Sequence, residues 1–124
     1  MSEMIIIRGL PGSGKTTMAK QIYSEHVLCE ADQFFEVNGV YCYDPAKIRE
    51  AHKWCQKKAY KELKKGNDVV VANTFVRVWE MKPYLDMGFK VQVMVATGNF
   101  KSIHQVPGNV VRRMRDQFED YSKK

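Results

Sequence analysis

The chain has 124 residues, 44% of them hydrophobic and 27% charged, with a formal net charge of +6. This content predicts one globular domain over residues 1–124 that buries roughly two thirds of the surface of the unfolded chain. The sequence has no apolar run of the ~18 residues that a membrane span needs, and the run before Arg8 is too short for a signal peptide. We therefore expect a soluble, intracellular, cytoplasmic protein with no membrane contact. The cysteines (Cys29, Cys42 and Cys55) show no Cys-x-x-Cys spacing and are expected to be free thiols in a reducing compartment.

The first element and the loop after it carry the strongest pattern. MIIIRG at residues 4–9 is rich in β-branched side chains and predicts a strand, and a helix is expected to open at Lys15. Between them, GLPGSGKTT has the glycine, lysine and threonine spacing of a P-loop. Glycines allow turns that aim successive N–H groups at one anion, and the helix adds its positive pole. We therefore predict ATP binding at Pro11, Gly12, Ser13, Gly14, Lys15, Thr16 and Thr17.

Two side chains of this loop have specific expected roles. The Lys15 ammonium is expected to reach the β- and γ-phosphates and to act in catalysis. The Thr16 hydroxyl is expected to bind Mg²⁺. ATP and Mg²⁺ are thus the predicted cofactors.

The middle of the chain predicts a strand, a turn and a long helix. Val27–Cys29 is a brief apolar strand, Asn38 and Gly39 mark a tight turn, and Asp44 before Pro45 is typical of a helix cap. The helix is expected from Pro45 to Lys65, with an apolar stripe at spacings of three and four: Ile48, Ala51, Cys55, Ala59 and Leu63. Lysines 53, 57, 61 and 64 form either a solvated face or a track for nucleic acid.

The remaining elements complete an alternating pattern. DVVVANT at 68–74 reads as a buried central strand, a helix is expected over 78–87 with Pro83 in its first turn or at a kink, and KVQVMVA at 90–96 is the last strand. VVRRMRDQFEDY at 110–121 predicts a closing helix. We expect an α/β P-loop NTPase fold: a doubly wound parallel sheet of about four strands, in the order 2-3-1-4, with helices on both faces.

Ligands in such sheets bind beyond the carboxyl ends of the strands. This edge holds the P-loop, Glu30 and Asp32 after the second strand, and residues 97–101 after the fourth. Asn73 and Thr74 follow the third strand and are candidate contacts to a substrate. Asp68 is expected at the opposite edge.

Several motifs together resemble one family. GLPGSGKTT, ADQFF, NGVYCYDPAKIREAHKWCQ, VVVANT, WEMKPY and HQVP…RRMRDQFE occur in the order found in polynucleotide-kinase-like P-loop phosphotransferases. This group includes the phage-type polynucleotide 5′-hydroxyl kinases and related AAA-type ATP-binding proteins. The resemblance implies a small parallel sheet, ATP with Mg²⁺ as phosphate donor, and Asp32 as the base that takes the proton of the attacking hydroxyl. Glu30 is the competing carboxylate.

The chain departs from this family at two places. Relatives commonly carry an acidic residue at the end of the third strand, where this chain has Ala72. The segment between the last strand and the last helix is short, with Lys101 where an arginine is expected. Arg112, with Arg113 beside it, matches a basic position that is expected to face the γ-phosphate in catalysis, unless it is an exposed arginine paired with Asp116.

Other polar and aromatic residues permit two interpretations. His52 is expected to be a hydrogen-bonded core residue, and His104 to position a loop. Trp54, Trp79 and Glu80 could line an acceptor groove, although packing is the favoured role for both tryptophans.

The combined pattern indicates an ATP-dependent phosphotransferase for the 5′-hydroxyl end of DNA or RNA. A kinase for a small hydroxyl acceptor, such as a metabolite or nucleoside, is an alternative. A nucleotide-binding regulatory module without transfer activity is another. The P-loop specifies only the phosphate donor, so the acceptor stays open at this point.

Overall fold

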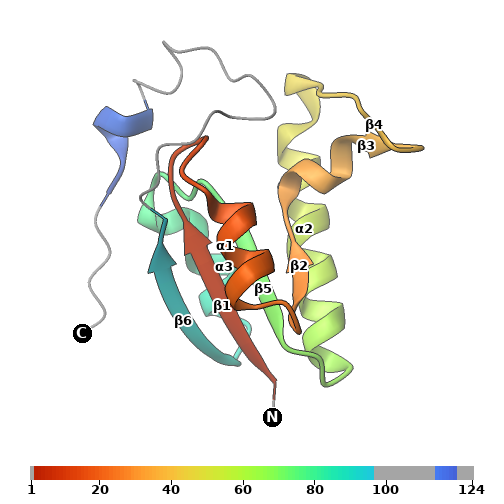
Figure 1. The fold of residues 1–124 in the computed structure, drawn as a ribbon, viewed down its shortest axis with the longest axis vertical. Coiled ribbons are helices and arrows are strands. Elements are labelled where there is room, and N and C mark those ends of the chain that lie inside the picture. The colour runs from red at the N-terminus through yellow and green to blue at the C-terminus, as the bar shows by residue number, and fades with distance from the viewer. Residues whose placement is uncertain (1, 97–113, 120–124) are drawn as a thin grey trace.

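The computed structural model describes residues 2–96 and 114–119. Its central element is a parallel sheet of four strands: β1 (Glu3–Arg8), β2 (Val27–Cys29), β5 (Val69–Asn73) and β6 (Lys90–Val95). The strands lie in the order β2-β5-β1-β6, which confirms the predicted order 2-3-1-4 (Figure 1). β1 pairs along its length with β5 on one side and β6 on the other.

Alternate side chains of the central strands form two separate apolar layers. Ile5 and Ile7 of β1 pack toward Ala19 of helix α1 (Lys15–Ile22). Met4 and Ile6 pack on the other face, against the buried side of helix α2 (Ile48–Lys64) and against the short helix α3 (Lys82–Leu85). Figure 1 shows α1 on one face of the sheet and α2 and α3 on the other. The predicted doubly wound arrangement is therefore confirmed.

The long helix follows its predicted cap and most of its predicted stripe. The Asp44 carboxylate accepts a hydrogen bond from the Ala46 N–H at 3.0 Å, and a 3-10 turn, η2 (Pro45–Lys47), leads into α2. The stripe residues from Ala51 to Leu63 are buried. Ile48, the first residue of the predicted stripe, is 41% exposed. The first turn of α2 projects past the carboxyl ends of the strands, where no sheet covers it (Figure 1).

A small hairpin stands apart from the sheet. After β2 the chain forms a 3-10 helix, η1 (Ala31–Phe35), and then the antiparallel strands β3 (Glu36–Val37) and β4 (Val40–Tyr41). Asn38 and Gly39 join these strands with φ values of 52° and 80°, as the predicted tight turn requires. The hairpin projects away from the sheet beside the start of α2 (Figure 1).

The helix predicted over residues 78–87 is divided. Its first part is the 3-10 helix η3 (Val78–Met81), and α3 follows with Pro83 in its first turn. Trp79 on η3 is 70% exposed, so the expectation that it packs in the core was wrong. Trp54 does pack against the core of the α2 face, as expected. Cys29, Cys42 and Cys55 are free thiols.

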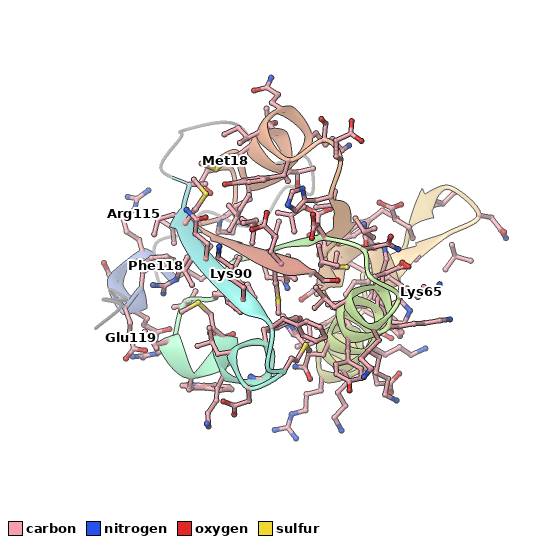
Figure 2. All side chains as sticks on the ribbon, turned by 90° about the horizontal axis from the view of Figure 1, so that it is seen from below. Met18, Lys65, Lys90, Arg115, Phe118 and Glu119 are labelled. Carbon is pink, nitrogen blue, oxygen red and sulfur yellow. The ribbon has the colours of Figure 1, made fainter. Side chains whose placement is uncertain are left out.

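The final described segment docks beside the sheet through a buried arginine. The Arg8 guanidinium is fully buried at the end of β1, donates two hydrogen bonds to the Phe75 carbonyl oxygen (3.1 and 2.6 Å) and lies 4.2 Å from the centre of the Phe118 ring. The Glu119 N–H donates to the Val76 carbonyl oxygen at 2.8 Å. Figure 2 shows Phe118 and Glu119 close together beside the sheet. Residues 114–117 are helical, and the rest of the closing helix predicted for 110–121 lies outside the described residues or, at 118 and 119, is not helical.

None of the helices in the described ranges is long and apolar enough to cross a membrane.

The stripe of α2 gives a direct stability test. Leu63 is 2% exposed, so we expect Leu63→Ala to lower the free energy of unfolding by about 3 kcal/mol through lost burial and a residual cavity. Ile48→Ala removes an exposed aliphatic side chain from the same stripe and should change the free energy of unfolding by less than about 0.5 kcal/mol. Urea denaturation of both variants measures the difference. Equal effects would contradict the packing described for α2.

Candidate phosphate-binding site

The P-loop begins with a close approach that only glycine permits. The Gly9 N–H donates to the Thr74 carbonyl oxygen at 3.2 Å, which ties the loop to the end of β5. A Cβ atom on residue 9 would lie 2.7 Å from the Ala96 carbonyl oxygen and would also collide with the Ser13 hydroxyl. The loop therefore passes tightly between the ends of two strands before it turns into α1.

Two glycines with positive φ form the turn that leads from the loop into helix α1. Gly12 and Gly14 have φ values of 80° and 90°, in the left-handed region that favours glycine, and Gly14 is the N-cap of α1. The positive pole of α1 thus opens into the loop, with no acidic side chain in its first turn. The Ser13 hydroxyl is buried and has no hydrogen-bond partner among the described residues. These features fit an anion such as a phosphate group. Pro11 and the exposed Thr17 flank this part of the loop.

The Lys15 side chain folds back into the loop. Its Nζ atom donates to the carbonyl oxygens of Gly9 and Leu10, each at 3.0 Å. Burial lowers the pKa of Lys15 to about 8, and the negative charges of Glu30 and Asp32 oppose this shift. Lys15, Glu30 and Asp32 therefore belong to one electrostatic site, although they come from two separate parts of the sequence.

Glu30 makes the contact that the sequence did not predict. Its carboxylate accepts a hydrogen bond from the Thr16 hydroxyl. Burial raises the pKa of Glu30, and the hydrogen bond from Thr16 acts in the opposite direction. A hydroxyl and a carboxylate are the hard oxygen ligands that Mg²⁺ takes beside its waters. The pair therefore fits a magnesium ion. Ala72 on β5 is buried and has no carboxylate to offer such an ion, whereas Glu30 places one beside Thr16.

Asp32 lies on η1 and is turned toward the hairpin. It is exposed, and its carboxylate accepts a hydrogen bond from the Tyr41 hydroxyl at 3.2 Å. The start of η1 is fixed to the sheet by Asn73, whose side-chain oxygen accepts from the Ala31 N–H at 2.9 Å. The Asn73 amide nitrogen in turn lies 3.7 Å from the Cys55 sulfur. The buried Asn73 thus positions the segment that carries Asp32, and its contact with a substrate stays a prediction.

The other predicted site residues have different outcomes. Thr74 contributes its carbonyl oxygen to Gly9, as described above, and its contact with a substrate also stays a prediction. Asp68 lies at the opposite edge of the sheet, as expected, where its carboxylate accepts from the Glu3 N–H at 2.8 Å. His52 is half-buried rather than a core residue. Lys101, His104, Arg112 and Arg113 lie outside the described residues.

The fold and the loop define the class of the protein. A parallel sheet of this order, a glycine loop at the end of its central strand and a lysine within that loop together form a P-loop kinase-like fold. Residues 4–97 match the model of the AAA domain family (AAA_33). The chain therefore belongs to this AAA domain family.

Other proteins are similar to this chain in sequence or in fold. The chain is 36% identical over 91 residues to human NEDD4-binding protein 2, an alignment that spans 70% of this chain and 5% of that protein. Its fold is similar to a chain in the structure of a Pnkp1/Rnl/Hen1 complex, with a TM-score of 0.65, 18% identity and coverage of 90% of this chain and 38% of that chain. A gluconokinase from Sinorhizobium meliloti 1021 has a TM-score of 0.62 at 15% identity, over 95% of this chain and 75% of that chain.

The pKa of Lys15 leads to a pH test. Because that pKa is lowered to about 8, the ammonium is mostly present at pH 7 and mostly lost at pH 9. We expect the affinity for ATP to fall about tenfold between these pH values if the bound state keeps the proton. Isothermal titration calorimetry measures this change.

Lys15→Arg is the matched control. Its guanidinium stays protonated over this range, so the fall in ATP affinity should disappear. A fall of equal size in the variant would assign the pH dependence to another group.

Proposed function

We propose that the protein is an ATP-dependent phosphotransferase that phosphorylates the 5′-hydroxyl end of DNA or RNA. The observation that carries this proposal is the meeting of two groups at one edge of the sheet. The P-loop supplies Lys15, and the segment after β2 supplies the carboxylates of Glu30 and Asp32. The negative charges of both carboxylates favour the protonated form of Lys15. Phosphoryl transfer needs both a cation for the donor phosphates and a carboxylate for the acceptor hydroxyl.

The P-loop residues serve the phosphate donor. Lys15 exchanges its hydrogen bonds to the Gly9 and Leu10 carbonyl oxygens for oxygens of the β- and γ-phosphates. The N–H groups at the start of α1 add further donors. Thr16 and Glu30 hold Mg²⁺, which neutralises charge on the phosphates when bound.

Asp32 serves the acceptor. As an exposed carboxylate near Lys15, it is accessible to a hydroxyl that approaches from solvent. It takes the proton as the oxygen forms its bond to phosphorus, while the Tyr41 hydroxyl holds the carboxylate in place. Asn73 supports this role indirectly, because it fixes Ala31 next to Asp32.

The choice of acceptor rests on two weaker supports. The net charge of +6 favours a polyanion, and the fold is similar to a chain of the Pnkp1-containing complex. The likeness to a gluconokinase favours the second candidate, a kinase for a small hydroxylated molecule. Ala72 at the end of β5 favours the third, a nucleotide-binding module without transfer, because this strand brings no carboxylate to the metal.

Transfer of labelled γ-phosphate tests the proposal. We expect label from ATP with Mg²⁺ to appear on 5′-hydroxyl oligonucleotides and not on oligonucleotides that already carry a 5′-phosphate. Asp32→Asn should lower the rate about 100-fold or more through loss of the base, with ATP affinity nearly unchanged. Label on gluconate or a nucleoside instead would favour the second candidate. An unchanged rate in Asp32→Asn would remove Asp32 as the base.

Glu30 has a test that does not depend on transfer. We expect Glu30→Gln to weaken binding of Mn²⁺, used in place of Mg²⁺, to the ATP complex by about tenfold or more, because the carboxylate beside Thr16 is lost. Electron paramagnetic resonance of free Mn²⁺ measures the affinity. Glu25→Gln, which changes an exposed glutamate after α1, should leave it unchanged. Equal affinities in both variants would place the metal elsewhere.

A further inference from the structure

An apolar groove lies between η1 and the segment 42–47 that follows the hairpin, outside the phosphate-binding site. Its volume is about 560 Å³, within the range of ligand pockets, and its lining includes Phe34, Phe35, Val37, Tyr43, Asp44 and Lys47. Large apolar side chains around it remain exposed: Val37 by 55%, Val40 by 61% and Tyr43 by 51%. Phe35 belongs to the core, but Val37, Val40 and Tyr43 contribute little to it, so folding alone does not account for these three exposed side chains.

Aromatic rings connect this groove to Asp32. Tyr43 contacts Phe35 edge to face, with ring centres 5.2 Å apart. The Tyr41 and Tyr43 rings are parallel within 9°, with centres 6.3 Å apart, and the Tyr41 hydroxyl donates to Asp32. A planar group held in the groove therefore lies one ring away from the residue that contacts the proposed base.

A row of positive charges continues from the groove along α2. Lys47 lies in the groove lining, and exposed basic side chains follow at steps of four residues: Arg49, Lys53, Lys57 and Lys61. Figure 2 shows nitrogen-tipped side chains of α2 pointing away from the sheet. Within the described ranges the salt bridge on α2 joins Glu62 to Lys65, at 3.5 Å, and the members of this row make none.

We propose that this groove binds an unpaired base near the 5′ end of a single strand of DNA or RNA, and that the row on α2 binds the phosphates that follow. This proposal rests on the proposed function, because it states where the nucleic-acid acceptor of that kinase binds. Aromatic faces stack on any base, which gives affinity without sequence preference. At the rise of an α-helix, the basic row is about 18 Å long from Arg49 to Lys61. This length exceeds that of a small metabolite and suits several successive nucleotides.

Binding of a single strand tests the groove separately from catalysis. Fluorescence anisotropy of a 3′-labelled oligothymidylate with a 5′-hydroxyl measures affinity at several salt concentrations. We expect Tyr43→Ala to weaken binding about tenfold and Tyr43→Phe, which keeps the ring, to preserve it. The double change Lys53→Gln with Lys57→Gln should reduce the slope of log affinity against log salt by about 1.4. Lys90→Gln, an exposed lysine on β6, is the matched control and should change neither.

The outcomes separate this proposal from the proposed function. Unchanged ATP affinity shows that each variant is folded. If Tyr43→Ala and the double lysine variant bind the oligonucleotide as tightly as the wild type, the groove and the row are not its binding site, even if phosphate transfer occurs. No oligonucleotide binding by the wild type would overturn the proposal as well. Tyr43-dependent binding without any transfer would support the groove and contradict the kinase function.

Discussion

β1 pairs with a parallel strand on each of its sides, and this pairing fixes the position of the loop that follows it. Its residues from Met4 to Ile7 are almost fully buried, because they pack between two apolar layers and two neighbouring strands. A strand held in this way has one fixed carboxyl end. The P-loop begins there, so the position of the phosphate cradle follows from the burial of β1.

The ends of the neighbouring strands complete the site because the four strands of the main sheet run parallel. β5 ends beside β1 and supplies Asn73 and Thr74, which hold η1 and Gly9. β2 ends one strand further away and supplies the carboxylates. Arg8 holds the loop after β5 through hydrogen bonds to the Phe75 carbonyl oxygen. The site is thus assembled from the loop motif together with backbone and side-chain contacts among the strand ends.

Local patterns in the sequence were sufficient to predict the four strands of the parallel sheet and the cap of α2, whereas the order of the strands followed from the P-loop fold class. Short apolar runs distinguish the strands from the helices. Asp44 followed by Pro45 is recognisable as a helix cap from the sequence alone. Periodicity shows which side of a helix is apolar, but it does not show how far the neighbouring layer extends, and Ile48 lies in the first turn of α2, past the ends of the strands. The packing expected for Trp79 came from its residue type alone, and this side chain is 70% exposed.

The division of roles between the two carboxylates could not be predicted from spacing. Glu30 and Asp32 both follow β2, and the alternation of a strand would place them on the same side. The strand ends at Cys29 and a 3-10 helix begins at Ala31, so Glu30 turns to Thr16 and Asp32 to Tyr41. That change of backbone depends on Asn73, which lies 42 residues away along the chain.

We expect ATP to bind at the carboxyl edge of the sheet, between the P-loop and the end of β2. Backbone amide chemical shifts, recorded while ATP and Mg²⁺ are titrated into labelled protein, test this position. We expect the largest shifts at Gly12, Gly14, Lys15 and Glu30, and none at Asp68 on the opposite edge. Shifts centred on the opposite edge, or none at the P-loop at saturating ATP, would show that ATP does not bind there.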